Sequence, residues 1–271
     1  MKKRIIAAVI LVPALLLILY VAPKWATAVL FSLVSALAAF ELLYGTKLVR
    51  HMRLVLYTVL AAALMPIWCF FGMHPVWGNA GILLFFLLML MEMMISQMRL
   101  KLSKVALCFT AGLVLPYMLA SVPRIMAMTN GRYLILIPFV VAFLSDTGAY
   151  FIGCKFGKHK LAPEISPNKS VEGVLGGIAF AVIGMLLYCL ILSVAFKCQV
   201  SYGYALAYGI IGSVAGVFGD LCFSVIKRQT GIKDYGNLIP GHGGALDRFD
   251  SMHVVAPLIE LLLMVLPVVV K

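Results

Sequence analysis

Long apolar runs, separated by short polar segments, extend along the whole chain. Runs of eighteen or more apolar residues are long enough to cross a bilayer as helices. The composition agrees, because 63% of the residues are hydrophobic and only 12% are charged, against about 25% charged in soluble domains. We therefore predict an all-α polytopic membrane protein of about nine transmembrane helices, at residues 5–22, 26–45, 54–72, 79–97, 105–122, 133–153, 173–196, 203–226 and 252–270.

The positive charges predict the orientation of these helices. Lys and Arg are enriched in the cytoplasmic segments of membrane proteins. If the N-terminus is cytoplasmic, 17 of the 22 Lys and Arg residues fall on the cytoplasmic side, and the others are Lys24, Arg124, Arg132, Lys197 and Lys271. We predict a cytoplasmic N-terminus and an outside C-terminus. The same asymmetry accounts for most of the net charge of +12 without a nucleic-acid partner.

The first apolar run has an alternative interpretation. Met-Lys-Lys-Arg, an apolar run and Ala26-Thr27-Ala28 resemble a signal peptide with a cleavage site. Because the run is long and a second span follows at once, we favour a retained transmembrane helix.

The chain shows no internal repeat and no Gly/Ser linker, so we predict one integral membrane domain over 1–271. Of ten acidic residues, only Glu41 and Glu92 precede Asp146. We therefore expect 1–140 to be hydrophobic scaffold spans. The expected catalytic spans are in 141–271, with cytoplasmic loops at 154–172 and 227–251.

Ionisable residues inside a bilayer are costly and are candidates for function. Five lie in the predicted spans: Glu41, Glu92, Asp146, Asp220 and Glu260. Asp220 and Asp146 lie roughly 9 Å below the cytoplasmic surface, and we expect both to point into one cytoplasmic cleft. Ser224 and Lys227 share a helix face with Asp220. We expect the three glutamates to form buried hydrogen bonds between helices instead.

The loop 227–251 combines cations, carboxylates and glycines. Lys, Arg and the backbone N–H groups of glycine-rich turns bind phosphates. Carboxylates would repel a phosphate unless a cation lies between them, and Mg²⁺ is held in this way. The loop predicts metal-assisted phosphate chemistry, although a solvated loop of surface ion pairs is the alternative.

The loop 154–172 has a similar composition. It contains Lys155, Lys158, His159 and Lys160, followed by Ser166-Pro167-Asn168-Lys169-Ser170. Ser170 is suited to cap the helix that follows, with Gly173, Gly176 and Gly177 on a packed face. Phosphate binding at this helix N-terminus is the other interpretation.

Four motifs together resemble the phosphatidate cytidylyltransferases, also called CDP-diacylglycerol synthases. The resemblance covers roughly 140–255, and the first 140 residues match only in being hydrophobic spans. The motifs are Ser145-Asp146-Thr147-x-Ala149-Tyr150, Ser166-Pro167-Asn168-Lys169-Ser170-x-Glu172-Gly173 with Gly219-Asp220-Leu221, and Ser224-x2-Lys227-Arg228-x4-Lys233-Asp234-x4-Ile239-Pro240-Gly241-His242-Gly243-Gly244-x2-Asp247-Arg248-x-Asp250-Ser251.

The resemblance implies a reaction of phospholipid biosynthesis. CTP and phosphatidate would give CDP-diacylglycerol and pyrophosphate, with Mg²⁺ as cofactor. It also implies a multi-pass protein of the bacterial inner (plasma) membrane whose active site faces the cytoplasm. Glycines spaced for close helix packing make a homodimer the expected assembly.

The resemblance and the residue pattern together suggest roles for the site residues. We expect Asp220 and Asp247 to hold the metal, and Asp146 is a candidate third acid. Lys227 is expected to act in catalysis beside them. The expected substrate-binding residues are Ser166, Asn168, Lys169, Ser224, Arg228, Lys233, His242, Gly243, Gly244 and Arg248.

Three other functions stay open. A CTP-dependent polyisoprenol kinase would share the basic loops but would transfer the γ-phosphate. A transporter or channel would use Asp146, Asp220 and Glu260 as an ion path. A structural subunit would leave the mixed acidic and basic loops unexplained.

Overall fold

The computed structural model describes residues 13–97, 99–236 and 243–270. Its elements belong to two compact units, each of which is described by itself. Unit 1 comprises residues 1–127 and 230–249, and unit 2 comprises residues 128–229 and 250–271. The single integral domain expected from the sequence stays a prediction.

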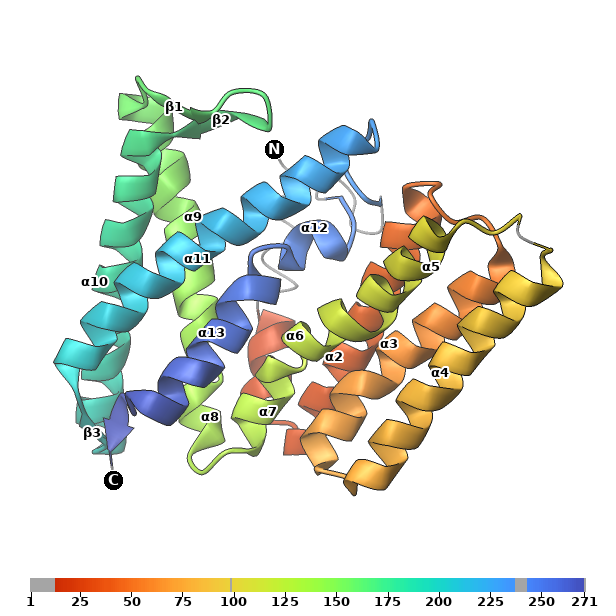
Figure 1. Cartoon of the computed structure of the whole chain (residues 1–271). Coiled ribbons are helices and arrows are strands. Elements are labelled where there is room, and N and C mark those ends of the chain that lie inside the picture. The colour runs from red at the N-terminus through yellow and green to blue at the C-terminus, as the bar shows by residue number, and fades with distance from the viewer. Residues whose placement is uncertain (1–12, 98, 237–242, 271) are drawn as a thin grey trace. The chain divides into compact units, whose positions relative to one another are not determined.

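The described part of unit 1 consists of helices joined by loops (Figure 1). A first helix covers 13–20. The elements that follow are α2 (Lys24–Phe40), the π-helix η1 (Glu41–Gly45), α3 (Met52–Phe71), α4 (Pro75–Ile95), α5 (Leu102–Phe109), the π-helix η2 (Thr110–Val114), α6 (Leu115–Leu119), α7 (Ser121–Ala127) and, much later in the chain, α12 (Leu246–Phe249).

Unit 2 is built on three long helices and two small antiparallel sheets (Figure 1). Strands β1 and β2 pair with each other, as do β3 and β4. In chain order its elements are α8 (Gly131–Leu134), α9 (Ile137–Phe156), β1 (Lys160–Ala162), β2 (Ser166–Ser170), α10 (Val171–Phe196), β3 (Gln199–Val200), α11 (Tyr202–Gln229), α13 (Met252–Val265) and β4 (Val269–Val270).

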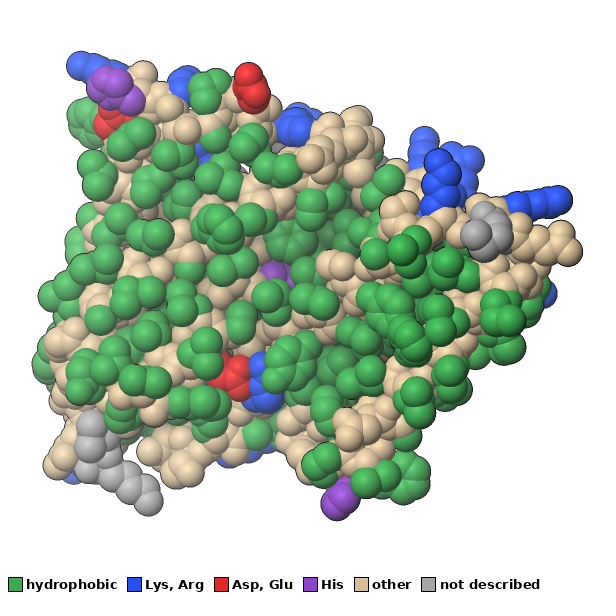
Figure 2. Space-filling view, viewed as in Figure 1, with side chains coloured by type: hydrophobic (Ala, Val, Ile, Leu, Met, Phe, Trp, Pro, Cys, Tyr) green, Lys and Arg blue, Asp and Glu red, His purple; other side chains and the backbone are tan. Residues whose placement is uncertain are grey.

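The polytopic membrane architecture is confirmed. Within the described part of the chain, seven helical stretches are long and apolar enough to cross a membrane, at 24–45, 52–71, 75–95, 102–127, 131–156, 171–196 and 202–229. Each coincides with a span predicted from hydropathy. Figure 2 shows apolar side chains covering the outer sides of these helices, as lipid-facing surfaces require.

The first and the last predicted spans differ from this pattern. The span expected at 5–22 lies largely outside the described residues, which begin at 13. The span expected at 252–270 was predicted too long, because α13 contains 14 residues and ends at Val265. Pro267 disfavours helical backbone at the residue before it, and β4 follows. A helix of 14 residues extends about 21 Å, less than the roughly 30 Å of hydrocarbon in a bilayer.

Unit 1 packs its helices around a core of aliphatic, alanine and aromatic side chains. Helix α2 packs along α3 and against α7. Phe31 of α2 meets Phe249 of α12 edge to face, with ring centroids 5.8 Å apart. The short helix α12 therefore packs on α2 although more than 200 residues separate them in sequence.

Unit 2 depends on close contact between helix backbones. Gly173 and Gly177 of α10 lie against α9, where a Cβ atom would come within 2.9 Å of the Ala149 carbonyl and 2.8 Å of the Ser145 carbonyl, respectively. This confirms the packed glycine face predicted for that helix. Helix α11 packs against α9 and α10, and the hydroxyls of Ser145 and Ser213 are 2.7 Å apart.

Candidate active site

In unit 2, Asp220 lies between a lysine and a serine. Its Oδ2 is 2.6 Å from the Nζ of Lys169, and its Oδ1 accepts a hydrogen bond of 3.2 Å from Ser224, one helical turn further along α11. The Nζ of Lys169 also lies 3.4 Å from the carbonyl of Val217. The structure thus brings together three residues that the sequence predicted for the site.

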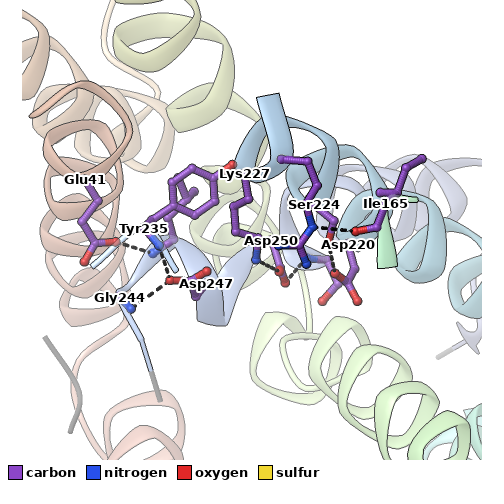
Figure 3. Close-up of polar contacts among 12 residues, drawn as sticks. Glu41, Ile165, Asp220, Ser224, Lys227, Tyr235, Gly244, Asp247 and Asp250 are labelled. Atoms are coloured by element: carbon purple, nitrogen blue, oxygen red, sulfur yellow. Dashed lines mark hydrogen bonds and ion pairs between the residues drawn. The ribbon is translucent and has the colours of Figure 1, made fainter. Parts of the chain in front are cut away.

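Lys227, two turns after Asp220 on α11, faces a different carboxylate. Its Nζ lies 3.9 Å from Oδ2 of Asp250, and the two side chains are only 12% and 14% exposed. The second oxygen of Asp250 accepts the backbone N–H of Ser251 at 2.8 Å. Figure 3 shows Lys227 and Asp250 pointing toward each other.

The charge around Asp250 is predominantly negative. Burial, the charge of Asp220 and, more weakly, the charge of Asp146 raise the pKa of Asp250 to about 7, against the opposing effect of Lys227. Asp220 and Asp146 therefore lie close enough to Asp250 for their charges to act on it. Asp146 itself is on the exposed side of α9.

The β1–β2 hairpin presents the other predicted binding residues of unit 2. Ser166, Asn168 and Lys169 are all on β2, and Asn168 is exposed. The Nε of Arg228, in the last turn of α11, donates a hydrogen bond of 3.0 Å to the carbonyl of Ile165 at the hairpin turn. Arg228 therefore tethers the hairpin in addition to the phosphate-neutralising role expected for it.

Ser170 ends the hairpin and begins α10. Its hydroxyl accepts the N–H of Gly173 at 3.2 Å, so the predicted N-cap is confirmed. Two residues after Ser170, the carboxylate of Glu172 accepts hydrogen bonds from the backbone N–H groups of Lys158 and His159. The same carboxylate lies 2.6 Å from a ring nitrogen of His159. These contacts fix the chain between α9 and the hairpin.

In unit 1, Asp247 is a buried acceptor for the loop that precedes it. Its Oδ2 accepts the backbone N–H of Tyr235 at 2.7 Å and that of Gly244 at 3.0 Å. Gly243 has a φ of +82°, and a Cβ atom there would lie 2.8 Å from the same oxygen. Glycine is therefore required at this position by both backbone conformation and space.

Three predicted site residues of this loop remain, of which two are described by the structure. Lys233 and Arg248 are exposed, which leaves their cationic groups accessible. His242 lies outside the described residues.

The sequence analysis did not include Glu41 or Asp250 among the site residues. Glu41 was expected to make buried hydrogen bonds between helices. It is buried, and its carboxylate accepts the backbone N–H of Ala245, in the loop, at 2.9 Å and that of Leu246, the first residue of α12, at 2.8 Å. These two residues immediately precede Asp247 in the chain. Asp250 was visible in the signature as its last carboxylate, so a census of all acids in that motif would have included it.

The donor set of unit 2 fits a hard divalent cation. Carboxylate oxygens are the ligands that Mg²⁺ prefers. The pKa of Asp250 is raised first by burial and then by the negative charge of Asp220, and a bound cation would offset that charge. Lys169 and Lys227 supply part of that neutralisation. Among the described residues, no group of three or more His, Cys, Asp or Glu side chains is arranged closely enough to hold a metal by itself. Phosphate oxygens commonly complete such a coordination shell.

Comparison with known families gives a match over almost the whole chain. The sequence model described as "Cytidylyltransferase family" matches residues 2–266.

Curated bacterial proteins also match, over a shorter length. A phosphatidate cytidylyltransferase of Staphylococcus saprophyticus is 46% identical over 135 residues, which are 50% of this chain and 50% of that protein. A protein of the same name from Bacillus subtilis is 47% identical over 124 residues, covering 46% of this chain and 45% of the relative. A third, from Staphylococcus aureus, is 45% identical over 135 residues and again half of each chain. Each alignment thus spans about half the length of the relative.

Proposed function

Because the chain belongs to the cytidylyltransferase family, we propose that it is a CTP:phosphatidate cytidylyltransferase of phospholipid biosynthesis. An oxygen of the phosphatidate phosphate attacks the α-phosphorus of CTP. The bond from that phosphorus to the β-phosphate oxygen breaks, so that CDP-diacylglycerol forms and pyrophosphate leaves. Several relatives that share half of this chain carry the name of this activity.

The observation that carries the proposal is the pairing of acids with lysines in unit 2. Asp220 pairs with Lys169 and Asp250 with Lys227. Phosphoryl and nucleotidyl transfer need no protein nucleophile, since the attacking phosphate is already anionic and the work is positioning and charge neutralisation. Paired lysines and carboxylates support both positioning and charge neutralisation. The lysines contact phosphate oxygens, and the carboxylates hold a metal.

We propose Mg²⁺ as the cofactor, with Asp220 and Asp247 each as a ligand and Asp146 as a further acid. When bound, Mg²⁺ supplies positive charge that offsets the negative charge developing on the phosphates. Lys227, held beside Asp250, acts on the transferring phosphate. Lys169, Ser166 and Asn168 on the hairpin contact the second substrate.

The remaining assignments concern the loop of unit 1 and the end of α11. Arg228, Lys233 and Arg248 neutralise triphosphate and lipid phosphate. Ser224 orients Asp220 through its hydrogen bond. Gly243 and Gly244 form the phosphate loop with His242.

The proposal includes an orientation and an assembly. We place the chain in the bacterial inner membrane, with about nine spans, the last of which requires the residues after Val265 as well as α13. The N-terminus and active site lie on the cytoplasmic side and the C-terminus outside. A reporter fused after residue 271 should then be active only if it is a periplasmic or extracellular reporter. We propose a homodimer as the assembly, and light scattering of the detergent-solubilised protein measures its mass.

The decisive assay uses purified protein with phosphatidate, Mg²⁺ and CTP labelled separately on the α- and γ-phosphates. The α-label is expected to enter the lipid and the γ-label to leave as pyrophosphate. If the γ-label instead enters a polyisoprenol supplied in place of phosphatidate, the protein is a CTP-dependent kinase. If no label moves and a chelator changes nothing, the proposal is wrong.

A further inference from the structure

A π-helix at the end of α2 places one buried carboxylate against the distant loop of unit 1. Glu41 is the first residue of η1 and is 6% exposed. Its Oε1 accepts the N–H of Ala245 at 2.9 Å and its Oε2 accepts the N–H of Leu246 at 2.8 Å. Both oxygens are thus bonded to residues more than 200 positions away in sequence. π-Helical turns occur frequently at functional sites.

Glu41 and Asp247 divide three consecutive backbone amides between them. The N–H of Gly244 binds Asp247, and the next two N–H groups, of Ala245 and Leu246, bind Glu41 (Figure 3). Asp247 is the residue that follows immediately. Because Glu41 fixes the two peptide groups that precede Asp247, it also fixes the position from which the Asp247 carboxylate extends.

Three glycines make this close approach possible. A Cβ atom at Gly236 would lie 2.5 Å from Oε1 of Glu41, and one at Gly244 would overlap the Glu41 carboxylate. At the other end of η1, a Cβ atom at Gly45 would lie 2.5 Å from the carbonyl oxygen of Tyr235. The loop and the π-helix therefore contact each other backbone to side chain, with no space for a larger residue.

We propose that Glu41 is a positioning residue that holds Asp247 in the geometry required for its role as a metal ligand. The proposal rests on the proposed function, because it assigns a task to Glu41 in that reaction. It extends the site to a helix that contains none of the signature motifs. Residues that orient metal ligands typically change metal affinity or activity by about 10–100-fold when they are replaced.

Glu41→Gln is the diagnostic variant. A glutamine has nearly the same volume but only one acceptor oxygen, so its NH₂ group faces one of the two backbone donors. Glu92→Gln is the matched control: it is also a glutamate of a unit 1 membrane helix, but its carboxylate lies 3.8 Å from Arg53. We expect Glu41→Gln to lower kcat by about 10–100-fold and to raise the Mg²⁺ concentration for half-maximal rate, with KM for phosphatidate nearly unchanged. Glu92→Gln is expected to leave all three values near wild type.

Hydrogen exchange provides a readout that does not depend on turnover. The amides of Ala245 and Leu246 are expected to exchange slowly in the wild type and in Glu92→Gln, and at least about tenfold faster in Glu41→Gln, since one lost hydrogen bond of about 1.4 kcal/mol corresponds to a factor of ten. If Glu41→Gln does not fold, Glu41→Asp replaces it. Aspartate keeps both acceptors on a shorter side chain and should give intermediate values.

Two results would overturn the inference. In the first, Glu41→Gln exchanges these amides at the wild-type rate. In the second, Glu41→Gln melts at a lower temperature, but its kcat and its Mg²⁺ requirement stay within about threefold of wild type. A change that small is less than positioning residues typically contribute and indicates a structural role only. If the wild type itself shows no cytidylyl transfer, the proposed function fails, whereas the exchange measurement still reports whether Glu41 anchors the loop.

Discussion

Lys169 and Asp220 form an ion pair in which Nζ lies 2.6 Å from Oδ2. The two residues come from different elements of unit 2, the hairpin strand β2 and the helix α11. Both side chains are partly buried, at 22% and 28% exposure, so the pair is less screened than one on an open surface. A lysine and a carboxylate held in this way can act on phosphate and metal without a large rearrangement.

This pair can be tested by a double-mutant cycle on thermal unfolding. Lys169→Met and Asp220→Asn each remove one partner, and the double variant is expected to be more stable than the sum predicts by about 1 kcal/mol. The cycle of Lys169→Met with Asp234→Asn, an exposed aspartate of unit 1, should be additive. Additivity in both cycles would mean that the Lys169–Asp220 pair does not form.

The lysine of this pair is also expected to bind substrate. Lys169→Met should raise KM for one of the two substrates by about tenfold, which corresponds to the loss of about 1.4 kcal/mol of a charge-assisted hydrogen bond. Steady-state kinetics with each substrate varied in turn identifies which one. A change in kcat alone would contradict a role in substrate binding.

Asp247 should be essential for turnover although it is not essential for folding. Asp247→Asn keeps one acceptor for the amides of Tyr235 and Gly244 but removes the charge that we propose for the metal. We expect activity below about a tenth of wild type, with the far-UV circular dichroism spectrum unchanged. Asp234→Asn removes the same charge thirteen residues earlier in the signature and should retain activity. Equal activities of the two variants would exclude Asp247 as a ligand.

The raised pKa of Asp250 predicts a pH-dependent stability. An aspartate has a pKa of about 3.9 in an unfolded chain and about 7 here, so between these values the folded state keeps a proton that the unfolded state has released. Stability should therefore fall as the pH rises from about 4 to about 7 and level off above it.

Thermal melts in EDTA measure this dependence. Asp250→Asn carries no charge at any pH and should remove most of the slope, whereas Asp234→Asn should keep it. A contribution of about 2 kcal/mol would lower the wild-type melting temperature by about 4–8 °C between pH 5 and pH 8. A wild-type slope equal to that of Asp250→Asn would show that Asp250 ionises normally.

Arg228 should control the order of the hairpin. Its Nε bonds the carbonyl of Ile165, so Arg228→Ala removes a charged hydrogen bond, worth about 1.5 kcal/mol or more. Limited trypsin digestion is expected to cleave after the exposed residues Lys158 and Lys160 about tenfold faster in this variant. Lys233→Ala removes the same charge from unit 1 and should leave that cleavage rate unchanged. A rise in both variants would point to net charge rather than to the tether.

The sequence by itself determined the membrane architecture. In lipid every backbone polar group must be bonded internally, so a long apolar run has almost no alternative to a helix. For this reason seven predicted spans recur within the described residues. Local signals were equally reliable where the interaction is local, as for the Ser170 cap and for the shared helix face of Ser224 and Asp220, which are hydrogen-bonded one turn apart. The exception is α13, which ends at Val265. The prediction extended this helix too far because it followed the apolar character of the residues and gave too little weight to Pro267.

The candidate site was predicted only as a set of residues. The motifs contained Asp220, Lys169 and Asp247, but no pattern in the chain indicates that Lys169 pairs with Asp220, or Lys227 with Asp250. Such pairings depend on how far each helix and strand is rotated and shifted against its neighbour. Periodicity specifies the buried face of an element but not that register.

Only the tertiary structure revealed which groups the Glu41 carboxylate binds. In sequence it is a single acid among apolar residues, and its expected hydrogen bonds had no identified partner. Its two partners lie 204 and 205 residues further along the chain. They are reached because α2 ends in a π-turn and because Gly236 and Gly244 leave space for its carboxylate. A buried carboxylate must be satisfied by donors, and the fold alone determines which backbone amides supply them.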